Sequence, residues 1–145
     1  MKRVLLVEDS ELIRSIVNDA LQTCFPCVTT TVEDGAQAFD ELSGNTYDLV
    51  ITDIMMPVMD GITLARKIRK EISSDIPIIV MTSLNEDRVR ESASQAGANA
   101  YVTKPLDYNQ LIEVVNNLVL IESEPDPEEP PEVQLFTDGD IEWEE

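Results

Sequence analysis

The stretch DLVITDIMMPVMDG, residues 48–61, ends an almost wholly apolar run on a carboxylate. Leu49, Val50 and Ile51 suit a strand that is covered on both faces, as in the middle of a parallel sheet. Asp53 follows closely behind them, and a charge in that position must reach water or find a partner. The stretch therefore predicts a buried strand that delivers a carboxylate to the edge of a sheet.

Strand and helix signals alternate on both sides of this stretch. Apolar or β-branched runs predict strands at residues 3–7, 27–32, 47–52, 76–81 and 100–103. Periodic apolar residues and capping signals predict helices at residues 10–21, 36–42, 62–71, 85–96 and 107–121. Five such βα units imply the α/β class, with a doubly wound, five-stranded parallel sheet, helices on both faces and right-handed crossovers.

The net charge of −19 is divided unevenly along the 145 residues. Residues 122–145 hold 11 acidic side chains and no basic one, which leaves 18 acids and 10 bases in residues 1–121. We therefore expect one domain over residues 1–121 and an acidic, Pro/Glu-rich tail over residues 122–145 that is disordered by composition. A field of this sign repels phosphates, so no nucleic acid partner is expected. No signal peptide or membrane-spanning run is evident, so we expect no membrane partner and a cytoplasmic location.

The chain contains no histidine. Its absence excludes Ser-His-Asp and Cys-His catalysis, as well as every histidine-containing metal site. Any phosphohistidine chemistry must therefore draw its histidine from another protein. The two cysteines, Cys24 and Cys27, are spaced like a redox pair, but they fall between a helix end and a strand, so we expect two reduced thiols in a turn.

Polar side chains follow four of the five predicted strands, namely Glu8, Asp9, Asp53, Thr82 and Lys104. In an open α/β sheet, ligands bind beyond the carboxyl ends of the strands. Carboxylates crowded at this edge repel one another, and a divalent cation relieves that repulsion. Because the ligands are all oxygens, the pattern predicts Mg²⁺ rather than Zn²⁺. A carboxylate beside the metal and a lysine suits a nucleophile that forms an aspartyl phosphate.

Four segments carry a family resemblance: VLLVEDS (residues 4–10), DLVITDIMMPVMDG (48–61), IPIIVMTS (76–83) and GANAYVTKP (97–105). Their order and spacing resemble the response-regulator receiver domains of two-component signalling. The resemblance covers residues 1 to about 121. It implies a flavodoxin/CheY-like (βα)5 fold with the strand order 2-1-3-4-5.

The same resemblance implies a role for each matching position. Asp53 would be the phosphorylated residue, and Asp9 and Asp53 would bind Mg²⁺ together with the main-chain carbonyl of Met55. Glu8 would hold a metal-bound water, and Mn²⁺ would be an acceptable substitute for Mg²⁺. Lys104 would contact the phosphoryl group.

The resemblance also implies a switch. The Thr82 hydroxyl would bind a phosphoryl oxygen, and Tyr101 would change its position when the domain is phosphorylated. An interpretation of Tyr101 as a packed aromatic is compatible with this role if the ring alternates between two positions. The implied protein is a stand-alone response regulator that switches protein–protein binding. The face that switches would be the family's α4-β5-α5 face, which here comprises the predicted helix over 85–96, the strand over 100–103 and the helix over 107–121.

The implied partner is a sensor histidine kinase or a histidine phosphotransfer protein, while the downstream protein target is not specified by the sequence. Monomer and phosphorylation-linked dimer both stay open. The expected chemistry is self-phosphotransfer with slow autodephosphorylation rather than turnover of a substrate as an enzyme. Met55 and Leu84, two residues beyond Asp53 and Thr82, resemble the family positions that govern the approach of water to the acyl phosphate. Both are apolar here and cannot orient an attacking water, so we predict a long-lived phosphoryl group.

Two other functions are compatible with parts of the sequence. A Mg²⁺-dependent aspartyl-phosphate phosphohydrolase of the haloacid-dehalogenase type would carry a second aspartate two positions after the nucleophile, where this chain has Met55. An acidic adaptor would act mainly through its tail, in which Phe136 and Trp143 are among the apolar residues that interrupt the acids. For the tail itself, a solubilising extension and a partner-binding segment are both open.

Overall fold

Five strands and five α-helices alternate along the chain in the computed structural model, which describes residues 1–56, 58–83, 87–104 and 108–120. The strands are β1 (Lys2–Val7), β2 (Cys27–Val32), β3 (Leu49–Asp53), β4 (Ile78–Thr82) and β5 (Ala100–Thr103). The helices are α1 (Glu11–Cys24), α2 (Gly35–Gly44), α3 (Gly61–Lys67), α4 (Asp87–Ala96) and α5 (Tyr108–Val115). Two π-helical turns, Ile68–Ile72 and Asn116–Leu120, extend α3 and α5.

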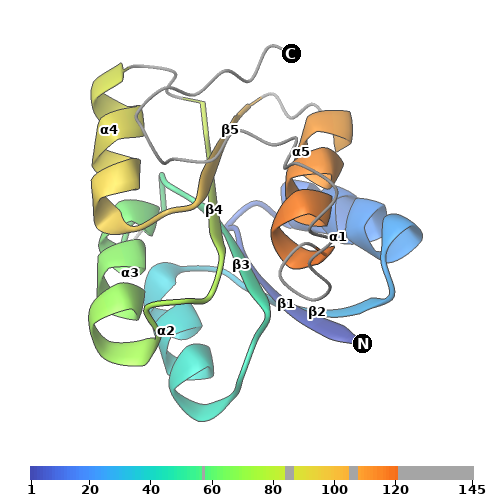
Figure 1. The fold of residues 1–145 in the computed structure, drawn as a ribbon, viewed down its shortest axis with the longest axis horizontal. Coiled ribbons are helices and arrows are strands. Elements are labelled where there is room, and N and C mark those ends of the chain that lie inside the picture. The colour runs from blue at the N-terminus through green and yellow to red at the C-terminus, as the bar shows by residue number, and fades with distance from the viewer. Residues whose placement is uncertain (57, 84–86, 105–107, 121–145) are drawn as a thin grey trace, which may run out of the picture.

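All strand pairs are parallel, and the strand order is β2-β1-β3-β4-β5. The sheet lies between two helical layers, with α1 and α5 on one face and α2, α3 and α4 on the other (Figure 1). This arrangement confirms the predicted doubly wound sheet and its order. The order reverses between β1 and β3, which is where open α/β sheets bind ligands.

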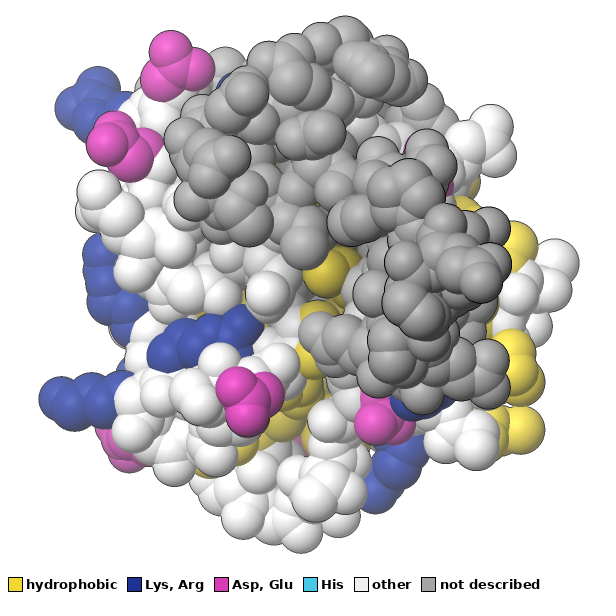
Figure 2. Space-filling view, viewed as in Figure 1, with side chains coloured by type: hydrophobic (Ala, Val, Ile, Leu, Met, Phe, Trp, Pro, Cys, Tyr) yellow, Lys and Arg dark blue, Asp and Glu magenta, His cyan; other side chains and the backbone are white. Residues whose placement is uncertain are grey.

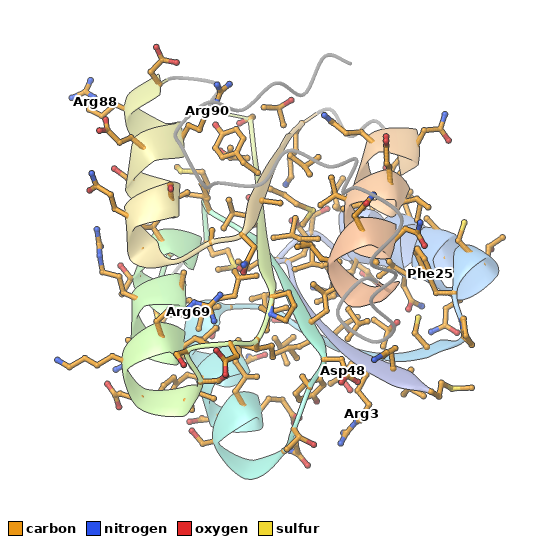
Figure 3. The ribbon with its side chains drawn as sticks, viewed as in Figure 1. Arg3, Phe25, Asp48, Arg69, Arg88 and Arg90 are labelled. Atoms are coloured by element: carbon orange, nitrogen blue, oxygen red, sulfur yellow. The ribbon has the colours of Figure 1, made fainter. Side chains whose placement is uncertain are left out.

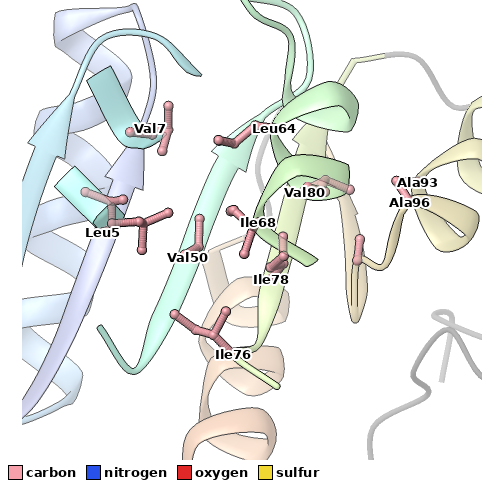
Figure 4. Close-up of a cluster of buried hydrophobic side chains, with 14 of the residues drawn as sticks. Leu5, Val7, Val50, Leu64, Ile68, Ile76, Ile78, Val80, Ala93 and Ala96 are labelled. Atoms are coloured by element: carbon pink, nitrogen blue, oxygen red, sulfur yellow. The ribbon is translucent and has the colours of Figure 1, made fainter. Parts of the chain in front are cut away.

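The core is divided by the sheet into two clusters, because successive side chains of a strand point to opposite faces. Val50, Ile78 and Val80 pack with α2, α3 and α4, while Leu49, Ile51 and Ile79 pack with α1 and α5. Figure 4 shows the first cluster, in which Leu64 of α3 and Ile68 of the π-helical turn lie over the central strands; α3 and this turn, residues 61–72, are called the α3 segment below. β3 and β4 are therefore buried on both faces and provide a rigid base for residues at their ends.

Three helices begin with a side-chain cap. Ser10, Asp34 and Asp60 each accept a hydrogen bond from the backbone N–H three residues further on, over 3.2, 2.9 and 2.8 Å. Such caps stabilise a helix start by about 1 kcal/mol each. The Ser10 cap was predicted from sequence; the predicted starts at Asn85 and Asp107 lie outside the described residues.

Some element boundaries differ from the prediction. β3 begins two residues later than expected and includes Asp53, which pairs with Met81 of β4. β4 begins at Ile78 instead of residue 76, since Pro77 has no N–H for the ladder; its carbonyl accepts from the Val50 N–H over 3.0 Å. The predicted helix over 62–71 is an α-helix followed by a π-helical turn, in which the Ser73 N–H donates to the Ile68 carbonyl over 2.8 Å.

Basic side chains are concentrated on one helical layer. The α3 segment and α4 carry Arg66, Lys67, Arg69, Lys70, Arg88 and Arg90, six of the ten basic residues of the chain. Figure 2 shows Lys and Arg side chains along the edge of the molecule where these helices lie. Within the described residues, no helix is long and apolar enough to cross a membrane. The predicted tail, residues 122–145, lies outside the described residues.

Candidate functional site

The carboxyl ends of β1, β3, β4 and β5 meet at one edge of the sheet, as their parallel order requires. Backbone hydrogen bonds continue past the strands and hold these ends together. The Ile54 N–H donates to the Met81 carbonyl over 2.9 Å, and the Lys104 N–H donates to the Thr82 carbonyl over 2.7 Å. The side chains that follow each strand therefore start from fixed backbone positions.

Lys104 joins two of the predicted acidic residues. Its Nζ lies 2.9 Å from Oδ2 of Asp53 and 3.2 Å from Oε1 of Glu8. Asp53 is 5% exposed and Glu8 is 1% exposed, so both carboxylates are removed from bulk water. A buried negative charge needs a partner, and in this structure Lys104 is that partner for both groups.

Asp9 completes an acidic cluster with Glu8 and Asp53. Each of the three residues offers one carboxylate oxygen, and these oxygens lie within 4.8 Å of one another. Mg²⁺ binds oxygens at about 2.1 Å, so two oxygens on one ion are at most about 4.2 Å apart. The cluster therefore fits a small hard cation after movements of a few tenths of an ångström.

The electrostatics of the cluster favour an added positive charge. Burial raises the pKa of Glu8, and the neighbouring Asp53 carboxylate raises it further, while the charge of Lys104 and a hydrogen bond from the Ser10 N–H act in the opposite direction. Burial lowers the pKa of Lys104, but its hydrogen bond to Asp53 and the charges of Asp53 and Glu8 outweigh burial, so the pKa of Lys104 is raised overall. Lys104 is thus held in its charged form beside acids that still repel one another.

Thr82 and Tyr101 lie on the same side of the sheet. Tyr101 belongs to the core cluster under α2, α3 and α4, and alternation along β4 places Thr82 on the face that Val80 occupies. Val80 pairs with Tyr101 and Thr82 pairs with Thr103, so the two side chains belong to adjacent strands. Thr82 is fully buried and Tyr101 is 2% exposed. The Tyr101 ring therefore occupies an inward position.

Gly61 contributes to the site and was not singled out from the sequence. Its N–H donates to the Ile54 carbonyl over 2.9 Å, and a Cβ at this position would collide with the carbonyl oxygen of Asp53. The first turn of α3 therefore lies directly against the backbone of the proposed nucleophile. In the sequence, the Asp60-Gly61 pair indicates a turn at this position, but it does not indicate that Gly61 contacts the backbone of Asp53.

The β3–α3 loop borders the site. The Met55 N–H lies 3.3 Å from Oδ1 of Asp53, so this residue is adjacent to the carboxylate, while its side chain is 58% exposed. The role of its carbonyl as a metal ligand stays a prediction. Val58 has a φ of 71°, a left-handed conformation that β-branched residues rarely adopt. Leu84, the other residue of the lifetime prediction, lies outside the described residues.

The cysteine pair has no part in this site. Both thiols are free; Cys24 is exposed and Cys27 is buried, with its Sγ 3.8 Å from the Leu21 carbonyl. They lie at the end of α1 and the start of β2, at the opposite edge of the sheet from Asp53. The two cysteines therefore flank the turn at residues 25–26, and their reduced state stays a prediction.

Known proteins are similar to this chain in sequence and in fold. The sequence model of the response regulator receiver domain matches residues 4–116. The chemotaxis protein CheY of Halobacterium salinarum is 33% identical over 118 residues, which are 81% of this chain and 97% of that protein. The gliding motility regulatory protein of Myxococcus xanthus is 37% identical over 103 residues, which are 70% of this chain but 13% of that protein.

Among solved structures, one receiver domain of a sensor histidine kinase from Pseudomonas aeruginosa is 31% identical, with a TM-score of 0.74. The match covers 81% of this chain and 97% of that domain, which holds a magnesium ion coordinated in its active site cleft. The strand order, the strand-end residues and these matches agree. The chain belongs to the response regulator receiver domain family of two-component signalling.

Proposed function

We propose that Asp53 accepts a phosphoryl group from the phosphohistidine of a sensor histidine kinase or a histidine phosphotransfer protein. The single observation that carries this proposal is the placement of Asp53. It is a nearly buried carboxylate at the end of a central strand, 2.9 Å from the Lys104 ammonium and grouped with Glu8 and Asp9. A carboxylate on a rigid strand is held more accurately than one on a loop.

In the reaction, an oxygen of Asp53 attacks phosphorus, an O–P bond forms and the P–N bond to the donor histidine breaks. The Lys104 ammonium, which pairs with the free Asp53 carboxylate, then pairs with the oxygens of the phosphoryl group. The Thr82 hydroxyl donates a hydrogen bond to one of those oxygens. Asp9, Asp53 and the Met55 carbonyl would hold Mg²⁺, with Glu8 binding a water of its shell. When bound, Mg²⁺ neutralises charge on the transferring group.

A docking surface for the donor lies beside this cluster. Leu12 is 68% exposed and Ile16 is 36% exposed, one turn apart on α1, which begins two residues after Asp9. Met55 and Val58 of the loop that follows Asp53 are 58% and 80% exposed. Exposed apolar side chains around a polar centre are typical of protein-binding surfaces. They suit a protein donor better than a small substrate.

The proposed output is a change in partner affinity at the α4-β5-α5 face. A phosphoryl group can shift a two-state domain only through contacts that differ between the two states. Thr82 and Tyr101 supply such contacts, since they lie on adjacent strands on the face covered by α3 and α4. We propose that the receiver unit spans residues 1–121, and that residues 122–145 form an acidic extension of it.

The test is incubation with acetyl phosphate and Mg²⁺, followed by intact mass spectrometry. We expect uptake of one phosphoryl group, which is lost in Asp53→Asn and after chelation of the metal. Asp40→Asn is the matched control, because Asp40 is an exposed acid on α2 and its replacement makes the same change in charge. Uptake at a residue other than Asp53, or no uptake from any donor, would refute the proposal.

The exposed Met55 side chain has no group that can orient a water for hydrolysis. We therefore propose that the aspartyl phosphate is long-lived when no phosphatase is present. A spontaneous half-life of a few seconds would contradict this part of the proposal. The same mass spectrometric assay, followed over time after removal of the donor, measures that half-life.

A further inference from the structure

Arg90 of α4 lies over the ring of Tyr101 of β5. The guanidinium carbon is 5.5 Å from the ring centroid, within the range of a cation–π contact. Tyr101 is 2% exposed, while Arg90 is half-buried, so the contact is partly shielded from water. Figure 3 shows Arg90 on the side of α4 that faces β5, whereas Arg88 projects away from the body of the molecule.

The contact between Arg90 and Tyr101 forms only when the Tyr101 ring is in its inward position. Tyr101 packs in the cluster that also contains Val80 and Ala93, and Val89 packs against that cluster from the same helix as Arg90. A rotation that moves the ring out of the cluster takes it away from the guanidinium. The cation–π contact therefore stabilises the inward position of the Tyr101 ring and does not stabilise the outward position.

We propose that Arg90 is a positioning residue that holds Tyr101 inward and so opposes the phosphorylation switch. The inference rests on the proposed function, in which phosphorylation at Asp53 favours another position of Tyr101. An activating ligand binds more weakly when its competent state is rarely populated. Loss of the Arg90 contact raises that population and tightens the binding of such a ligand.

The experiment measures the affinity of the Mg²⁺-loaded protein for beryllofluoride, a mimic of the phosphoryl group. Arg90→Met keeps an unbranched apolar stem but removes the guanidinium, and Arg88→Met makes the same change at an exposed position of the same helix. A cation–π contact of ordinary strength corresponds to a change of about two- to five-fold. We expect beryllofluoride to bind Arg90→Met tighter by this factor and to bind Arg88→Met as it binds the unaltered protein.

The variant Arg90→Lys distinguishes the contribution of planar stacking on the ring from the contribution of the positive charge. Lysine keeps the positive charge as a compact ammonium that stacks poorly on a ring. We expect its affinity for beryllofluoride to exceed that of the unaltered protein, but by less than the increase seen for Arg90→Met. A purely structural role for Arg90 would lower the melting temperature without tightening the binding of beryllofluoride.

A second readout is taken on the variants without metal or mimic, and the unaltered protein bound to Mg²⁺ and beryllofluoride provides the reference spectrum. The chain has three tyrosines, so ¹³C-labelled tyrosine yields few ring signals, which Tyr→Phe variants assign. In Arg90→Met, the Tyr101 signal should move toward its beryllofluoride-bound position, and in Arg88→Met it should stay unchanged. An unchanged signal together with unchanged or weaker binding in Arg90→Met would overturn the inference. Failure of the unaltered protein to bind beryllofluoride would instead count against the proposed function.

Discussion

Glu8 is a carboxylate that is almost completely buried and faces both a lysine and another carboxylate. Its Oε1 accepts from Lys104 over 3.2 Å, and its Oε2 accepts from the Ser10 N–H over 3.2 Å. These two bonds favour the charged form, yet burial and Asp53 raise its pKa overall. Glu8 is thus a destabilised charge in the metal-free protein. The neighbouring Asp9 is exposed, although the two residues are adjacent in sequence.

This leads to a prediction about pH. Because the folded-state pKa of Glu8 lies above its unfolded value, the folded protein binds more protons between the two values, and the free energy of unfolding falls as the pH rises through that interval. When a chelator keeps the protein free of metal, Glu8→Gln should remove this fall in the free energy of unfolding. Glu113→Gln, at an exposed position of α5, should leave the fall unchanged. Urea denaturation from about pH 4 to about pH 8 measures both. An identical pH dependence in the two variants would contradict the prediction.

Val58 is a second residue whose conformation has consequences. Its φ of 71° places a β-branched, 80% exposed side chain in the left-handed region. Asparagine tolerates this region better, so Val58→Asn should stabilise the protein by about 1 kcal/mol. Val28→Asn is the control, because Val28 is an exposed residue of β2, where a β-branched side chain is favoured. Chemical denaturation should show a gain for the first variant and none for the second.

At the scale of elements, α3 lies against the end of β3 with no room for a side chain between them. Gly61 begins α3, and its missing side chain leaves room for the carbonyl oxygen of Asp53. The hydrogen bond from the Gly61 N–H to the Ile54 carbonyl fixes the start of α3 beside the residue that follows Asp53. The position of Asp53 therefore depends on a helix that contributes no side chain to the acidic cluster.

Gly61→Ala should consequently affect both stability and phosphorylation. The new Cβ overlaps backbone atoms that cannot move easily, and overpacking of this kind costs about 1–3 kcal/mol. We also expect slower phosphorylation by acetyl phosphate, since the end of β3 must shift. Gly44→Ala at the end of α2 is the matched control, because a Cβ there meets nothing within 4 Å. Equal phosphorylation rates for the two variants would show that the contact does not position Asp53.

At the scale of the whole molecule, the charge distribution suits a protein that binds a cation at its acidic cluster. The chain has a net charge of −19, and three of its acids converge where four strand ends meet. The basic residues of the α3 segment and α4 lie on the helical layer at one edge of the molecule (Figure 2). A cation at the cluster adds contacts between acidic residues at the ends of β1 and β3 that otherwise repel one another.

Mg²⁺ should therefore stabilise the folded chain. A ligand that binds only the folded state contributes about 2.7 kcal/mol at about 100 times its dissociation constant. We expect the melting temperature to rise with Mg²⁺ or Mn²⁺ and to return to its starting value with chelator. Asp9→Asn should lose most of this rise, and Asp40→Asn, at an exposed position of α2, should keep it. A rise of equal size in both variants would show that the ion binds elsewhere.

Much of this protein is determined by the sequence alone. The spacing of apolar residues along the chain defines five βα units. A half-buried strand buries every second side chain, whereas a helix buries side chains three or four residues apart. The parallel order that such units adopt brings the carboxyl ends of the strands to one edge of the sheet. The residues of the candidate site were thus predictable wherever they end a strand, as Asp53 and Thr82 do, or follow one within two residues, as Glu8, Asp9 and Lys104 do.

Only the tertiary structure decided how these residues interact. It buries Glu8 and exposes Asp9, and it pairs Lys104 with carboxylates that are 96 and 51 residues away. It also places Arg90 over Tyr101. Local periodicity carries no information about distances between segments that are far apart in sequence. Those distances follow from how the helices pack on the twisted sheet, and that packing sets the burial, the charge pairing and the ring position on which the proposed switch depends.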